Sequence, residues 1–164
     1  MKVNTKQMIS AALFAALVLV LTFFIKVPLP NGYANLGDCA VLLAGWLLGP
    51  IYGLASAAIG SMLADIFSGY AMYAAATFII KGLMALVAYA LYQKLKKHAN
   101  RILSLIISGA FAELLMVFGY FVFEDVLYGA GMALLNIPFN AIQGAVGLIV
   151  ALFFMGAFKK TNKK

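Results

Sequence analysis

Charge is scarce in this chain of 164 residues. Only 10% of its residues are charged, whereas 65% are hydrophobic, and the mean hydropathy is +1.02. Soluble domains average about a quarter charged residues and about half apolar residues. The composition therefore excludes an ordinary soluble domain and predicts an integral membrane protein. No linker-like or low-complexity stretch divides the chain, so we expect one domain over residues 1–164.

Residues that form common catalytic and metal sites are also scarce. The one cysteine, Cys39, excludes an intramolecular disulfide and a cysteine cluster. The one histidine, His98, lies in a basic segment without neighbouring ligands, as is typical of a solvated loop. The motifs G-x-x-x-x-G-K-S/T, G-x-S-x-G and HExxH are absent. We therefore expect no enzyme activity, no metal site and no cofactor.

Long apolar runs make up most of the chain. About 20 helical residues cross the roughly 30 Å hydrocarbon core of a bilayer. The pattern predicts an all-α integral membrane protein with six transmembrane helices in one compact bundle. The second run is so short that we do not expect it to cross fully. The runs are Met8–Ile25, Cys39–Leu48, Ile51–Phe67, Tyr73–Tyr92, Ile102–Phe123 and Met132–Phe158.

Basic residues fall on one side of this predicted bundle. Ten of the twelve lie at the two termini or in the segment Lys94–Arg101. Because cytoplasmic loops are enriched in Lys and Arg, six spans with both termini cytoplasmic fit better than five. The acidic pair Glu124–Asp125 is expected to form a loop on the other side. Topology thus accounts for the net charge of +7, and we expect no nucleic-acid partner.

Lys81 interrupts an apolar run and is the least expected residue of the chain. A lone ammonium group within a membrane is costly and marks a functional site by default. Glu113 is the one acidic residue in the middle of the fifth run, so it is the expected partner of Lys81. Asn136, Asn140 and Gln143 share one helical face at a similar depth. Two interpretations stay open, a polar ligand pocket or a structural Lys–Glu pair with amides that join helices.

The segment Lys26–Asp38 contains two prolines and two glycines, which exclude a continuous helix. Its part from Pro28 to Asp38 is long and polar enough to cover an outward-facing cavity, although ordinary connecting loops have similar lengths. Tyr33, Tyr70, Tyr73 and Tyr120 are predicted near the same membrane face. They are candidates for stacking on a ligand or for an interfacial aromatic belt.

Small residues recur on the first helix. Ala11, Ala12, Ala15 and Ala16 form two overlapping Ala-x-x-x-Ala patterns, which allow another helix to approach closely. The pattern is equally compatible with packing inside the bundle and with contact to another subunit.

Several segments resemble a known family. Pro30–Asp38, Leu42–Pro50, Ala64-Asp65 and Ala75–Gly82 are similar to the substrate-binding S components of energy-coupling factor (ECF) vitamin transporters. The similarity is greatest to the riboflavin-type subgroup, which also includes proteins for pyridoxine-like and hydroxymethylpyrimidine substrates. It extends over nearly the whole chain, and residues 30–82 are its most specific part.

The resemblance implies capture of a vitamin or precursor at the outer face of a bacterial cell membrane. It also implies partners, namely a membrane coupling subunit, which meets Ala11, Ala12, Ala15 and Ala16, and two ATPase subunits. The polar candidates favour vitamin B6 or hydroxymethylpyrimidine, with riboflavin next. The alternative is a stand-alone secondary carrier or a structural membrane protein. The candidate ligand contacts are Asn35, Asp38, Tyr70, Tyr73, Lys81, Glu113, Tyr120, Asn136, Asn140 and Gln143.

Overall fold

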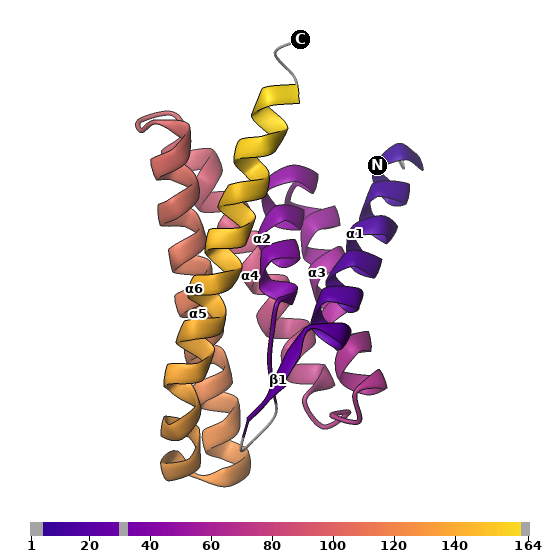
Figure 1. Ribbon diagram of the computed structural model, residues 1–164, viewed down its shortest axis with the longest axis vertical. Helices are drawn as coiled ribbons and strands as arrows, with labels where there is room; N and C mark the ends of the chain where they lie inside the picture. Colours follow the sequence, from indigo (N-terminus) through magenta and orange to yellow (C-terminus); the bar gives the residue numbers. More distant parts are fainter. Residues whose placement is uncertain (1–4, 30–32, 162–164) are drawn as a thin grey trace.

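The computed structural model describes residues 5–29 and 33–161 and is almost entirely helical, as predicted. Five helices are long and apolar enough to cross a membrane, and α2, with 12 residues, is shorter. A two-stranded hairpin, β1–β2, joins α1 to α2 (Figure 1). The elements are α1 (Thr5–Phe24), β1 (Lys26–Pro28), β2 (Tyr33–Asn35), α2 (Gly37–Leu48), α3 (Pro50–Phe67), α4 (Ala74–Leu95), α5 (Arg101–Tyr128) and α6 (Ala130–Thr161).

Helix α2 is the centre of the bundle. It packs against α1, α3, α4 and α6, and ten of its 12 residues, Gly37–Trp46, are buried. From Cys39 onward the helix is apolar on all sides, and a helix of this kind can be buried completely. Gly45 lets α4 approach closely, because a Cβ atom there would lie 2.4 Å from the carbonyl oxygen of Ala85.

The hairpin pairs β1 and β2 in antiparallel register, with Lys26 opposite Asn35 and Pro28 opposite Tyr33. The backbone N–H of Leu36 donates to the carbonyl of Ile25 at 3.1 Å and closes the base of the hairpin. The prediction that no continuous helix runs through Lys26–Asp38 is confirmed for the described residues, but α2 already begins at Gly37, inside the predicted segment. Its strand pairing was not predicted, because each strand is only three residues long.

One predicted loop is wrong. Glu124 and Asp125 lie within α5, which continues to Tyr128 and turns at Gly129 (φ +84°). No proline or glycine interrupts the segment from Tyr120 to Tyr128, so the helix has no reason to end earlier. The buried Glu124 accepts a hydrogen bond from Asn136 of α6, which makes its place inside the bundle possible.

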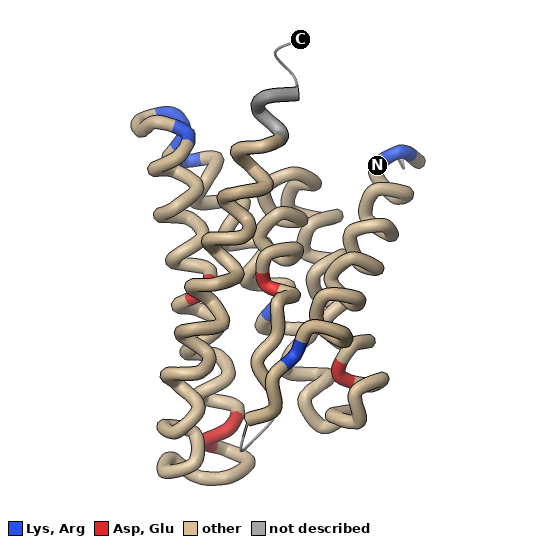
Figure 2. The backbone as a smooth tube through the Cα atoms, viewed as in Figure 1, with Lys and Arg blue, Asp and Glu red and all other residues tan. Residues whose placement is uncertain are grey.

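The N-terminal end of α1 and the C-terminal end of α6 lie at the same end of the bundle. The hairpin lies toward the other end (Figure 1). Basic residues gather mainly at the end with the termini, whereas acidic residues lie in the middle and toward the hairpin end (Figure 2). This arrangement agrees with an even number of passes through the bundle. The side that faces the cytoplasm stays a prediction.

Candidate ligand-binding site

A small polar cavity lies beside the hairpin. Its volume is about 30 Å³, and its wall contains two carboxylates, four tyrosines and three side-chain amides. The hairpin, α3, α4, α5 and α6 all contribute to this wall. The lining residues are Leu29, Tyr33, Asn35, Asp65, Tyr70, Tyr73, Thr77, Tyr120, Glu124, Asn140 and Gln143.

Lys81 forms an ion pair with Asp38, and both side chains are almost fully buried (2% and 0% exposed). The predicted pair of Lys81 and Glu113 is therefore wrong. The physical reason is the central position of α2, whose first turn brings Asp38 between α4 and α6. An acidic side chain in the first turn also interacts favourably with the helix dipole.

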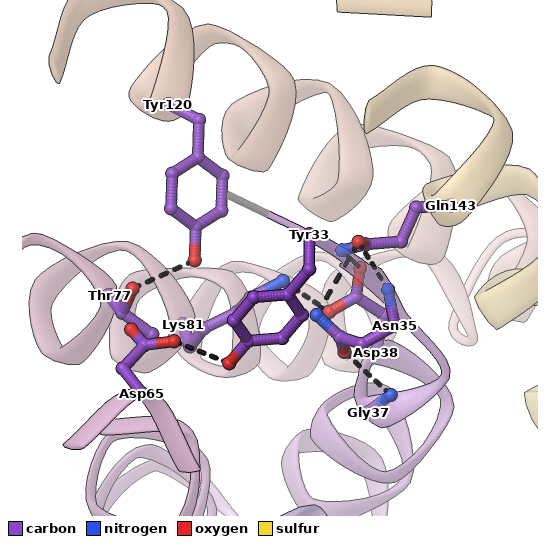
Figure 3. Close-up of polar contacts among 9 residues, drawn as sticks. All are labelled: Tyr33, Asn35, Gly37, Asp38, Asp65, Thr77, Lys81, Tyr120 and Gln143. Carbon is purple, nitrogen blue, oxygen red and sulfur yellow. Dashed lines mark hydrogen bonds and ion pairs between the residues drawn. The ribbon is translucent and has the colours of Figure 1, made fainter. Parts of the chain in front are cut away.

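Gln143 connects this ion pair to the hairpin. Its Nε2 donates to the second carboxylate oxygen of Asp38 at 2.6 Å, and its Oε1 accepts from the backbone N–H of Asn35 at 2.8 Å. The Oδ1 of Asn35 in turn accepts from the backbone N–H of Gly37 at 2.8 Å. The hairpin is thus joined to α6, α2 and α4 by one chain of polar contacts (Figure 3).

Asp65 and Tyr33 form a second polar contact at the cavity. The hydroxyl of Tyr33 donates to Oδ1 of Asp65 at 2.6 Å. Burial, and then the nearby Asp65 carboxylate, raise the pKa of Tyr33, so this hydroxyl stays protonated and remains a donor at physiological pH. Across the cavity the hydroxyls of Thr77 and Tyr120 lie 3.0 Å apart (Figure 3).

Glu124 anchors the part of the wall formed by α5. Its Oε2 accepts from Nδ2 of Asn136 at 3.1 Å, and its Oε1 lies 3.5 Å from the hydroxyl of Tyr73. Burial, rather than any one neighbour, is the main cause that raises the pKa of Tyr73. The rings of Tyr33 and Tyr70 lie 5.1 Å apart, and those of Tyr70 and Tyr73 lie 6.3 Å apart. These rings form a continuous aromatic wall.

Six predicted contact residues line the cavity, and four do not. Asp38, Lys81 and Asn136 are buried behind the wall, where polar contacts connect them to Gln143 or Glu124. Glu113 is buried without such a contact to a lining residue. Those that line the cavity are Asn35, Tyr70, Tyr73, Tyr120, Asn140 and Gln143.

Sequence reasoning named Tyr33 only as one of four tyrosines that could stack on a ligand. It missed Leu29, Asp65, Thr77 and Glu124 as lining residues. Glu124 shares a helical face with Glu113 and Tyr120, at spacings of 11 and 4 residues, and this periodicity was the available signal. Asp65 is the one charged residue of its run, which was the corresponding signal in α3.

Glu113 lies in a different environment from Asp38. It is 7% exposed, and neither of its carboxylate oxygens has a hydrogen-bond partner among the residues that the structure describes. It packs against Gly144 of α6, where a Cβ atom would lie 2.8 Å from Oε2 of Glu113. In the same described ranges, no three His, Cys, Asp or Glu side chains are grouped so that they could hold a metal ion.

The alanines of α1 border a separate apolar groove of about 440 Å³ against α3. Packing between α1 and α3 uses part of the alanine-rich face of α1. A Cβ atom at Gly60 would lie 2.4 Å from the carbonyl oxygen of Ala15, and the Ser56 hydroxyl donates to the carbonyl of Ala11 at 2.9 Å. The remainder of the groove is open. It is lined by Ala11, Ala12, Ala15, Ala16, Leu19, Ala55, Ser56, Ile59 and Leu63.

Residues 2–160 match a family model described as the S component of the ECF-type riboflavin transporter. The riboflavin transporter RibU of Staphylococcus aureus (strain TCH60) is 32% identical over 90% of this chain and 87% of its own length. The thiamine precursor transporter HmpT of Lactococcus lactis subsp. cremoris (strain MG1363) is 27% identical over 97% of this chain and 91% of its own length. A solved S component of a bacterial ECF transporter superposes with a TM-score of 0.78 at 28% identity, covering 97% of this chain and 98% of that chain.

Proposed function

Because the chain belongs to the family of ECF-type riboflavin transporter S components, we propose that it captures one small vitamin or vitamin precursor for ATP-driven uptake. The family and the named relatives are transport components and not enzymes. In this proposal the chain binds the ligand at the outer face of a bacterial cell membrane, with both termini cytoplasmic. A coupling subunit and two ATPase subunits supply the energy.

The polar cavity beside the hairpin is the observation that carries the proposal. Its volume of about 30 Å³ has room for about one or two water molecules, whereas small-molecule sites usually enclose about 300–1,000 Å³. A vitamin therefore enters only if the lining moves apart. The contact between Asn35 and Gln143 joins the hairpin to α6, so it must break or lengthen when the hairpin moves outward.

Vitamin B6 and hydroxymethylpyrimidine are the favoured ligands, with riboflavin next. A compact ring fits a wall that combines tyrosine faces with amides, because the rings stack and the amides fix orientation. The relatives are named for riboflavin and for a thiamine precursor, which supports riboflavin and hydroxymethylpyrimidine, whereas vitamin B6 rests on the chemistry of the wall alone. The proposed direct contacts are the six lining residues Asn35, Tyr70, Tyr73, Tyr120, Asn140 and Gln143, supported from behind by Asp38, Lys81 and Asn136, with Glu113 also buried in the bundle.

Equilibrium binding by the purified protein tests the ligand proposal. We expect submicromolar affinity for at least one of pyridoxine, pyridoxamine, hydroxymethylpyrimidine and riboflavin. Gln143→Leu should weaken that affinity at least about tenfold, because it removes hydrogen bonds at the wall and behind it. Gln93→Leu is the matched control, because Gln93 lies near the C-terminal end of α4, far along the helix from the lining residue Thr77. This variant should not change the affinity. If no compound binds more tightly than micromolar, the vitamin function is wrong.

The groove between α1 and α3 is the proposed docking surface for the coupling subunit, through Ala11, Ala12, Ala15 and Ala16. Ala12→Trp fills this groove, whereas Leu13→Trp enlarges a residue that is 66% exposed and outside the groove lining. We expect only Ala12→Trp to abolish co-purification with the coupling subunit and the ATPases, with ligand binding intact in both variants. Ligand accumulation in liposomes by the chain alone would instead identify a secondary carrier.

A further inference from the structure

The charge balance of the cavity wall is one-sided. Asp65 and Glu124 line the cavity and are 5% and 3% exposed. Among the described residues that line it, none is Lys, Arg or His. A buried carboxylate is costly unless a cation or several hydrogen-bond donors compensate it. The wall therefore offers acceptor oxygens, and an occupant that brings a cation or hydrogen-bond donors supplies the compensation that these carboxylates need.

One of these acceptors lacks a hydrogen bond of ordinary geometry, although the Thr77 hydroxyl lies near the Asp65 carboxylate. Oδ1 of Asp65 accepts from Tyr33, but Oδ2 is buried and has no hydrogen-bond partner in the described part of the chain. Buried polar atoms are nearly always hydrogen-bonded, and an unpaired one marks either a cost or a function. At the wall of a cavity in a binding protein, such an atom is a natural acceptor for an N–H or O–H group of the ligand.

The nearby cations do not restore the balance. Lys81 is committed to Asp38 behind the wall, so that pair adds no net charge. Lys26 of β1 is exposed at the rim, where its ammonium group donates to the hydroxyl of Ser68 at 2.8 Å. Glu113 of α5 adds a further buried carboxylate, and α6 has no charged residue between 130 and 157. Both ammonium groups lie close to lining rings, Lys26 at 5.2 Å from the ring centre of Tyr33 and Lys81 at 5.5 Å from that of Tyr120. The buried carboxylates nevertheless outnumber these two cations, so the surroundings of the cavity keep an excess of negative groups.

Aromatic side chains complete a surface that suits a cation. Tyr33, Tyr70 and Tyr73 line the cavity together, with neighbouring ring centroids 5.1 Å and 6.3 Å apart. The negative faces of aromatic rings attract cations, and groups of such rings hold ammonium ligands in other proteins. Carboxylates and tyrosine faces therefore favour the same kind of ligand.

We propose that the cavity selects a small heteroaromatic compound that carries an amino or ammonium group, held by Asp65 and Glu124 and stacked on the tyrosines. This inference rests on the proposed vitamin-binding function and narrows its ligand class. A compound in which the amino group is replaced by hydroxyl loses the charge-assisted contact. A phosphate ester of the same ring binds worst, because it brings negative charge to two carboxylates.

Matched ligand pairs test the selectivity. Pyridoxamine and pyridoxine share a ring and differ by an aminomethyl and a hydroxymethyl group. Hydroxymethylpyrimidine and its analogue with hydroxyl in place of the ring amino group form the second pair. For at least one pair we expect the amino compound to bind at least about tenfold more tightly, as for a charge-assisted contact. The phosphate ester pyridoxamine phosphate should bind more weakly than pyridoxamine.

Isosteric variants assign the selectivity to the wall. Asp65→Asn and Glu124→Gln keep the shape of the side chain and remove its charge, and at least one of them should reduce the amino preference to less than about threefold. Asp125→Asn is the control, because Asp125 is an exposed carboxylate on the same helix as Glu124. This variant should keep the full preference for the amino compound. Thermal unfolding of each variant establishes that it is folded.

The outcomes separate this inference from the function on which it rests. Equal or tighter binding of the hydroxyl compounds, or tight binding of riboflavin alone, overturns the amino selectivity and leaves vitamin capture standing. An amino preference that survives in both charge-removing variants overturns the roles of Asp65 and Glu124. If no compound of the panel binds, the vitamin function and the inference both fail.

Discussion

Asp38 and Glu113 are both buried carboxylates that pack against glycines of α6, yet their surroundings differ. Asp38 has an ion pair with Lys81 and a hydrogen bond from Gln143, and Gly147 leaves room for it. Glu113 lies against Gly144, and its oxygens have no hydrogen-bond partner among the described residues. The comparison teaches that burial alone does not give an acidic residue its importance, because its partners decide what its removal costs.

Removal of the charge at Asp38 should have the largest effect. Asp38→Asn leaves the ammonium group of Lys81 buried without its counterion, and loss of one partner of a buried pair costs about 3–5 kcal/mol of unfolding free energy. Thermal and denaturant unfolding in detergent measures the loss.

The double variant Asp38→Leu/Lys81→Met is the control for this prediction. Replacement of a buried ion pair by apolar residues of similar size is often neutral, so most of the stability should return. A double variant as unstable as Asp38→Asn would contradict the view that the unpaired cation causes the loss.

A smaller effect is expected from the glycine that makes room for Asp38. A Cβ atom at position 147 would lie 2.8 Å from Cβ of Asp38, so Gly147→Ala must displace α2 or α6 at a cost of about 1–3 kcal/mol. Gly156→Ala is the matched control, because no atom lies within 4 Å of its Cβ position. Unfolding measurements on both variants should show a loss at position 147 and none at 156. Equal effects would mean that the close approach is unimportant.

Neutralisation of Glu113 should have the smallest effect. Glu113→Gln removes a carboxylate without an observed hydrogen-bond partner, so we expect a change in unfolding free energy within about 1 kcal/mol, in either direction. The same unfolding assay, run beside Asp38→Asn, measures the contrast directly. If Glu113→Gln loses as much stability as Asp38→Asn, the two carboxylates are equivalent and the comparison fails.

The helices could largely be predicted from the chain, because each apolar run is long enough to require burial in lipid and helices satisfy their own backbone groups. The buried positions of Lys81, Glu113 and the amides of α6 also followed, since isolated polar residues in apolar runs avoid lipid. Helix ends were harder to predict. The pair Glu124–Asp125 was predicted to end the fifth helix because both residues are charged, but α5 continues through them. Asn136 of α6 donates a hydrogen bond to Glu124, which makes the burial of Glu124 possible.

The sequence by itself determined that Lys81, Glu113 and the amides of α6 lie within the bundle, since an isolated polar residue in an apolar run avoids lipid. It did not determine the burial of Asp38 and Glu124, which stand at the ends of apolar runs. Only the tertiary structure decided which polar groups meet. The short α2 packs at the centre and brings Asp38, rather than Glu113, to Lys81. The fold also brings Asp65 of α3 and Glu124 of α5 to one cavity wall, although they are 59 positions apart in the sequence. Partners of this kind depend on which helices are neighbours, and local periodicity along one helix does not contain that information.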